Sequence, residues 1–277
     1  MFRTRLASGI VIAITMILFM WLGGAYLSIL LLTVSLIGMY EFYHAVGILD
    51  DGKRLDLITG IGYAGSVAYY LVMYFSKCDL FCLFFVCVLL LLVMLASYVF
   101  TFPAYNARTV ICSFYGFFYV AVMLSFIYMT RTLENGILII WLILTSSWLC
   151  DVFAYFTGML IGKHKLAPVL SPKKSVEGAV GGIVFPAIIA AAVGYVLRGY
   201  FSADFPVIPA FTVLTAVGAA VSQIGDLSAS AIKRNHNIKD YGSIIPGHGG
   251  ILDRFDSMIF TAPMIYFIAV FFMSSGK

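Results

Sequence analysis

Charged residues are scarce in this chain of 277 residues. Asp, Glu, Lys and Arg make up only 11% of it, whereas hydrophobic residues make up 62% and the mean hydropathy is +1.02. Soluble globular domains carry about 25% charged residues, so this composition excludes that class. No run of about 30 polar residues occurs either, which excludes a separate soluble domain.

Other absences narrow the class further. None of the five cysteines is spaced C-x-x-C from another, so we expect free thiols that pack as small hydrophobes. The net charge of +4 is modest and gives no reason to expect a nucleic-acid partner. No small-x-small site ends the first apolar run, which argues against a cleaved signal peptide. No internal repeat is visible, which counts mildly against an inverted-repeat transporter.

Long hydrophobic runs are abundant, and many approach the ~20 residues that span a bilayer as a helix. They predict an all-α polytopic integral membrane protein with about nine transmembrane helices. The expected helices are 5–22, 25–46, 57–76, 79–101, 109–130, 136–161, 179–198, 206–232 and 255–273. The first five fall in residues 1–135, which carry few functional signals. The last four fall in residues 136–277, where we expect the catalytic region, with cytoplasmic loops at 162–178 and 233–254.

Basic residues are distributed unequally between the two sides that nine spans would define. Thirteen of the 17 fall on the side of the N-terminus and only four on the other. The positive-inside rule therefore predicts that the N-terminus and both polar loops face the cytoplasm. We expect the membrane to be a bacterial-type inner (cell) membrane.

Two predicted helices carry an aspartate among apolar residues, and a charge there is costly unless it is paired or functional. Asp226 shares one face of its helix with Ser230 and Lys233, at spacings of four and seven residues. Asp151 shares a face with Ser147 and Tyr155 in the same way. We therefore expect Asp226 in the active site, supported by Ser230 and by Asp151.

The first helical region contains one comparable carboxylate. Glu41 lies within an apolar run beside Tyr40, Tyr43 and His44. We expect it either to line a cavity or to pair with a polar group at the cytoplasmic end of its helix.

The two polar loops combine basic, hydroxyl and glycine residues. The first contains Ser171, Lys173, Lys174 and Ser175, a set that suits phosphate because lysine is a point charge and hydroxyl groups add donors. Five residues of the segment around the second loop are expected to bind phosphate or shape a nucleotide pocket: Lys239, His248, Gly249, Gly250 and Arg254. Lys233 and Arg234, the first two residues of this loop, are assigned to phosphate as well.

Carboxylates gather at the same end of the chain. Asp253 and Asp256 are three residues apart and therefore neighbours on the last helix. Together with Asp226 they predict a cage of oxygen ligands for Mg²⁺.

These residues form two long patterns. The later one reads Ser228-x-x-x-x-Lys233-Arg234-x-x-x-x-Lys239-Asp240-x-Gly242, followed by Pro246-Gly247-His248-Gly249-Gly250-x-x-Asp253-Arg254-x-Asp256. The earlier one begins Asp151-x-x-Ala154-Tyr155 and ends Ser171-Pro172-x-Lys174-Ser175-x-Glu177-Gly178. Both resemble the signatures of the phosphatidate cytidylyltransferases, over roughly the C-terminal half of the chain.

The resemblance implies that CTP and phosphatidate react to CDP-diacylglycerol and pyrophosphate with Mg²⁺, and it suggests a second cation such as K⁺. In that scheme the catalytic residues are Asp226, Asp253, Lys233, Arg234 and Lys174. The lipid phosphate is already anionic, so no protein nucleophile is needed, and the enzyme acts by positioning and by electrostatics. A homodimer is also an expectation, because Gly158/Gly162 and Gly178/Gly182 suit helix packing within or between subunits.

Three other functions compete with this one. A CTP-dependent lipid-alcohol kinase would share the metal and nucleotide chemistry but transfer the γ-phosphoryl group. A CDP-alcohol phosphotransferase is disfavoured because its D-G-x-x-A-R…D-x-x-x-D pattern is absent. An ion-coupled transporter would use Asp151 and Asp226 as ion sites, but the polar residues gather on one side of the membrane.

Overall fold

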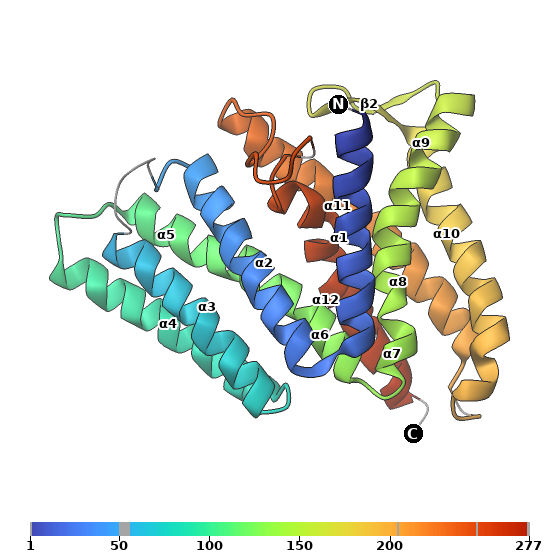
Figure 1. The fold of residues 1–277 in the computed structure, drawn as a ribbon, viewed down its shortest axis with the longest axis horizontal. Helices are drawn as coiled ribbons and strands as arrows, with labels where there is room; N and C mark the ends of the chain where they lie inside the picture. Colours follow the sequence, from blue (N-terminus) through green and yellow to red (C-terminus); the bar gives the residue numbers. More distant parts are fainter. Residues whose placement is uncertain (1, 50–55, 204, 248, 276–277) are drawn as a thin grey trace. The chain divides into compact units, whose positions relative to one another are not determined.

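The computed structural model describes residues 2–49, 56–203, 205–247 and 249–275, and the side chains of 8–274 within those ranges. Of the residues singled out above, His248 lies outside the described residues. Figure 1 shows a chain built almost entirely of helices. The nine predicted helices are present in the described residues, and eight helical segments are long and apolar enough to cross a membrane. In α1 (Phe2–Leu22), the stretch Ser8–Leu22 is a shorter apolar helix.

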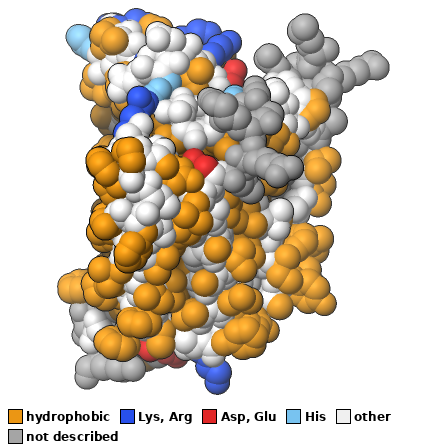
Figure 2. All heavy atoms as spheres, turned by 90° about the vertical axis from the view of Figure 1, so that its left-hand side faces the viewer, with side chains coloured by type: hydrophobic (Ala, Val, Ile, Leu, Met, Phe, Trp, Pro, Cys, Tyr) orange, Lys and Arg blue, Asp and Glu red, His pale blue; other side chains and the backbone are white. Residues whose placement is uncertain are grey.

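The exposed side chains of these helices are largely hydrophobic, as expected of surfaces that meet lipid tails. In Figure 2 orange side chains cover the middle of the view, and most Lys and Arg side chains lie toward its upper and lower ends. The most apolar helix, α4 (Leu80–Phe100), exposes Phe81, Phe84 and Leu92 among many others. The chain is therefore an integral membrane protein.

Contacts divide the chain into two compact units. The first comprises residues 1–128 and 236–254, and the second comprises 129–235 and 255–277. The segment 236–254 thus belongs with the N-terminal helices by its contacts. The predicted division into residues 1–135 and a catalytic region of residues 136–277 concerns function rather than contacts, and it stays a prediction.

Helices of the first unit begin where the sequence supplies caps. Gly23 and Gly24 have φ of 64° and 50°, and this backbone separates α1 from α2 (Gly24–Ala45). Asp56 caps α3 (Leu57–Phe75) and Asn106 caps α5 (Ala107–Gly116), each through its side-chain oxygen. A π-helical turn, η1 (Phe117–Val122), joins α5 to α6 (Met123–Thr132).

The second unit holds the remaining elements. They are α7 (Gly136–Ile139), α8 (Trp141–Leu144), the π-helical turn η2 (Thr145–Leu149), α9 (Cys150–Ile161), β1 (Lys165–Ala167), β2 (Ser171–Ser175), α10 (Val176–Leu197), η3 (Arg198–Tyr200), α11 (Val207–Asn235) and α12 (Leu252–Ser275). The first three residues of α12 belong by contacts to the first unit.

Three local features of this unit were not expected. β1 and β2 pair antiparallel as a hairpin within the first polar loop, and α10 starts at Val176, three residues earlier than predicted. The wide turn η2 also breaks the α-helical spacing between Ser147 and Asp151. Ser147 is fully buried and donates to Thr261 Oγ1 of α12 at 3.3 Å, and Asp151 is exposed. That these two residues share one face stays a prediction.

Small residues let α9 and α10 pack closely along each other (Figure 1). A Cβ added to Gly178 would lie 2.6 Å from the Ala154 carbonyl oxygen, and one added to Gly182 would lie 2.9 Å from that of Cys150. The contact of Gly158 with Gly178 lies within the chain, so the homodimer stays a prediction.

We expect Gly182→Ala to lower the free energy of unfolding by about 1–3 kcal/mol, because backbone cannot move aside as a flexible side chain does. Thermal unfolding in detergent measures this. The control is Gly199→Ala, since a Cβ there meets nothing within 4 Å. Equal stability of the two variants would contradict the packing described here.

Candidate active site

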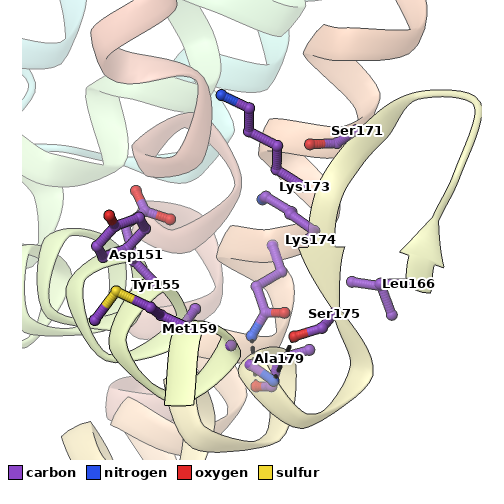
Figure 3. Close-up of a pocket in the computed structure, with 13 residues that line it drawn as sticks. Asp151, Tyr155, Met159, Leu166, Ser171, Lys173, Lys174, Ser175 and Ala179 are labelled. Atoms are coloured by element: carbon purple, nitrogen blue, oxygen red, sulfur yellow. Dashed lines mark hydrogen bonds between the residues drawn. The ribbon is translucent and has the colours of Figure 1, made fainter. Parts of the chain in front are cut away.

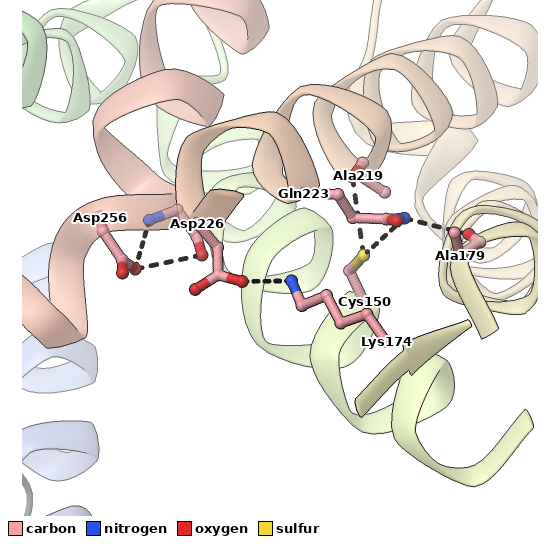
Figure 4. Close-up of polar contacts among 8 residues, drawn as sticks. Cys150, Lys174, Ala179, Ala219, Gln223, Asp226 and Asp256 are labelled. Atoms are coloured by element: carbon pink, nitrogen blue, oxygen red, sulfur yellow. Dashed lines mark hydrogen bonds and ion pairs between the residues drawn. The ribbon is translucent and has the colours of Figure 1, made fainter. Parts of the chain in front are cut away.

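The site in the second unit is organised around an ion pair between two segments distant in sequence. Lys174 on β2 donates from Nζ to Asp226 Oδ2 on α11 (Figure 4). Both side chains are partly exposed, at 27% and 28%. The pair satisfies a carboxylate that otherwise would be costly in an apolar helix, and it fixes the hairpin against α11.

More charged groups surround Asp226. Asp256 on α12 is only 6% exposed, and its Oδ1 accepts from Ser257 N at 2.7 Å. Its charge interacts with those of Asp226, Lys233 and Asp151. Lys233 is itself 8% exposed, at the end of α11. The structure therefore brings together three predicted carboxylates and two predicted lysines within one unit.

The donor chemistry of this cluster fits Mg²⁺. Among the described residues, no group of three or more His, Cys, Asp or Glu side chains is arranged so that it could hold a metal ion. Mg²⁺, however, commonly takes one or two carboxylates and completes its shell with water and substrate phosphates. Asp226 and Asp256 are two carboxylates of the kind that Mg²⁺ takes, and their role as ligands stays a prediction.

A pocket of about 340 Å³ opens beside this cluster. In Figure 3, Ser171, Lys173 and Lys174 on β2 lie on one side and Asp151 and Tyr155 on α9 on the other. Apolar side chains complete the lining, among them Met159 and Leu166. The pocket thus offers ammonium groups and a hydroxyl for an anion, next to a wall that suits hydrocarbon.

The hairpin that carries the lysines is held at its ends by side chains. Ser175 Oγ accepts from Gly178 N at 3.1 Å and so caps α10. Glu177 accepts from Lys163 N at 3.0 Å and pairs with His164 Nδ1 at 2.6 Å. These contacts close the loop between α9 and α10 and limit where Lys173 and Lys174 can go.

A second pocket, of about 540 Å³, lies in the first unit and is formed by the loop before α12. Its lining residues are Lys239, Asp240, Gly242, Ser243, Ile245, Gly247, Gly249 and Arg254. Two of its glycines, Gly247 and Gly249, have φ of 78° and 81°, a conformation that side chains disfavour. The predicted residues Lys239, Gly249 and Arg254 are thus brought together at one pocket.

Asp253 has a structural task at this pocket. Its Oδ2 accepts from Tyr241 N at 2.8 Å and from Gly250 N at 3.0 Å. The amide of Gly250 is consequently used within the chain. A role of Asp253 as a metal ligand and of Gly250 in nucleotide binding stays a prediction.

Comparison with known proteins decides the family. The model of the cytidylyltransferase family matches residues 3–272. The phosphatidate cytidylyltransferase of Bacillus subtilis (strain 168) is 30% identical over 98% of both chains. That of Thermotoga maritima is 36% identical over 60% of this chain and 61% of its own. That of Staphylococcus saprophyticus is 39% identical over 53% and 55%.

The chain belongs to the cytidylyltransferase family. The resemblance inferred from the two polar patterns is therefore confirmed, and it extends over nearly the whole chain rather than its C-terminal half alone.

Several residues that line the first pocket were not predicted from the sequence. Gln223 lines the pocket and donates from Nε2 to Ala179 O at 3.0 Å. It lies three residues before Asp226 on α11, so helical spacing was an available signal. Met159 gave no signal, because apolar residues are ordinary in membrane helices. Leu166 lies on β1 in the first polar loop, where only charged, hydroxyl and glycine residues were singled out. Arg234 is exposed at the end of α11, and Ser230 is half-buried there.

We expect Ser175→Ala to lower the free energy of unfolding by about 1 kcal/mol, because α10 loses its capping oxygen. Thermal or denaturant unfolding in detergent measures the change. Ser171→Ala is the matched control, since Ser171 begins strand β2 rather than a helix. If both variants unfolded like the parent, the cap would contribute nothing.

Proposed function

We propose that this protein transfers the cytidylyl group of CTP to phosphatidate, giving CDP-diacylglycerol and pyrophosphate in the membrane. This is the activity named for its relatives, and the site suits it. The observation that carries the proposal is the pocket on the membrane helices that combines Lys173 and Lys174 with an apolar wall, beside Asp226 and Asp256.

The reaction requires the protein mainly to position the two substrates and to offset their negative charge. A phosphate oxygen of phosphatidate attacks the α-phosphorus of CTP, a new P–O–P bond forms, and the bond to pyrophosphate breaks. Both reactants are polyanions, so their approach is repulsive unless cations offset it. Lys174, Lys233 and Arg234 provide fixed positive charge, which needs no reorganisation during the reaction.

We propose Asp226 and Asp256 as the residues that hold Mg²⁺. Asp253, predicted as a third ligand, belongs to the first unit and accepts from Tyr241 N and Gly250 N there, so its role at the metal stays a prediction. A bound Mg²⁺ offsets the charge of the phosphate oxygens as they react. A second cation such as K⁺ is part of the same proposal.

We further propose that each pocket serves one substrate. The pocket of the second unit suits phosphatidate, because its lysines can hold the phosphate while Met159 and Leu166 border the acyl chains. The loop pocket of the first unit is more polar and glycine-rich, and suits the triphosphate of CTP.

The charge distribution supports an orientation for this reaction. Lys173, Lys174, Lys233 and Lys239 belong to the two polar loops or their edges, and we place these loops and the N-terminus at the cytoplasmic face of the membrane. CTP would then reach the site from the cytoplasm and phosphatidate from the bilayer. The proposal needs no nucleic acid, and a homodimer remains compatible with it.

We expect Asp226→Asn to reduce Mg²⁺-dependent transfer by at least about 100-fold, because the electrostatic pairing in the site is lost. Purified protein in liposomes receives phosphatidate and CTP labelled on the α- or γ-phosphate. The control is Asp79→Asn, since Asp79 caps α4 and asparagine caps equally well.

The labels also separate the competing functions. Cytidylyl transfer puts the α-label in lipid and the γ-label in pyrophosphate. A γ-label in lipid would indicate a kinase instead. Folded protein that transfers neither label but mediates CTP-independent ion flux would favour a transporter, and near-normal transfer by Asp226→Asn would overturn the metal assignment.

We expect Lys173→Ala to raise the KM for phosphatidate about tenfold and leave the KM for CTP within about twofold, because one charged contact is lost. Lys239→Ala should show the reverse pattern. Steady-state kinetics with each substrate varied in turn measure both constants, and each variant is the control for the other. A matching rise in both constants would contradict the assignment of one substrate to each pocket.

A further inference from the structure

Glu41 is a buried carboxylate in α2, far in sequence from either polar pattern. Its side chain is 2% exposed and lies within the first unit. A carboxylate in such a place is tolerated only when hydrogen bonds replace its lost water. Its partners therefore indicate what it is for.

Both oxygens of Glu41 accept from the backbone at the start of α12. Ile251 N donates to Oε1 at 2.9 Å, and Leu252 N donates to Oε2 at 2.8 Å. These amides have no partner inside a helix that begins there, and a negative charge also complements the positive end of the helix. Hydrogen bonds to a charged acceptor are stronger than neutral ones.

The contact continues into the loop that forms the second pocket. A Cβ on Gly242 would lie 2.6 Å from Glu41 Oε1, and one on Gly250 would collide with Oε2. Glu41 thus fills the space beneath both glycines, and Gly242 lines the pocket. Gly250 N donates to Asp253, so two carboxylates hold three successive amides, those of residues 250 to 252.

We propose that Glu41 is a positioning residue of the nucleotide site: it sets the shape of the loop pocket by holding the start of α12 and the backbone of Gly242 and Gly250. This rests on the proposed function, in which that pocket takes the triphosphate of CTP. Ser8 of α1 assists, because its Oγ donates to Pro246 O at 3.1 Å. The N-terminal helices thereby contribute to substrate binding without touching substrate.

The test is Glu41→Gln, an isosteric change that leaves one acceptor where two amides need partners. Two readouts are taken on the full-length protein in detergent or liposomes. The rate of hydrogen exchange of the amides in residues 249–253 measures directly whether their hydrogen bonds to the carboxylates are kept. Kinetics follow its consequence: we expect the KM for CTP to rise about tenfold while the KM for phosphatidate stays within about twofold.

Two controls make the result specific. Glu134→Gln makes the same chemical change at an exposed carboxylate and should alter neither readout. Gly250→Ala disturbs the same contact from the side of the loop and replaces Glu41→Gln if that variant fails to fold. It should raise both the rate of hydrogen exchange and the KM for CTP. Its own control is Gly60→Ala, since a Cβ there meets nothing within 4 Å.

The outcomes separate this inference from the proposed function. Unchanged exchange in Glu41→Gln would overturn the inference, as would a rise in both KM values, which indicates general damage. A parent protein that folds but neither binds nor turns over CTP would overturn the proposed function instead. In that case, faster exchange in Glu41→Gln would still support the positioning contact, and unchanged exchange would reject it.

Discussion

The cost of burying charge in an apolar chain governs this structure. Each carboxylate within a membrane helix must find donors inside the protein, because lipid supplies none. Glu41 finds two backbone amides and Asp226 finds the Lys174 ammonium. Because donors are few, the charged residues gather, and the gathered charges are also what two polyanionic substrates require. One constraint thus explains both the packing of the polar segments and the location of the candidate site.

The helices were predictable from the sequence because their signal is length and hydropathy, which neighbouring helices hardly modify. The hairpin β1–β2 was not, because its strands of three and five residues are too short to show alternation. The turn η2 was equally hidden, since its extra residue has no sequence signature. Its effect is local: it interrupts the α-helical spacing just before Asp151, and Ser147 within it is fully buried.

The candidate site shows the same difference: features within one segment could be predicted from the sequence, and contacts between distant segments could not. Asp226 was identifiable from the cost of its burial, and the lysines from their pattern. The pairing of Asp226 with Lys174, 52 residues away, depends on the packing of α10 against α11 and of β2 against α9 and α10, and it could not be read from spacing. The use of the Gly250 amide by Asp253 was hidden for another reason. The sequence does not show which backbone amides form hydrogen bonds within the fold. A glycine motif therefore suggests a free amide donor even where the fold has already paired that amide.

The hydrogen bonds of Glu41 show what a motif omits. The residues proposed to bind phosphate are constrained in type, and they belong to the recognisable pattern in the C-terminal half. A carboxylate that holds the backbone behind that pattern, 210 residues away from Ile251, needs only to reach two amides. Glycines at 242 and 250 leave room for Glu41, so two positions of the pattern accommodate a residue that lies outside the pattern. The family match across nearly the whole chain is consistent with such a division of labour between chemistry and support.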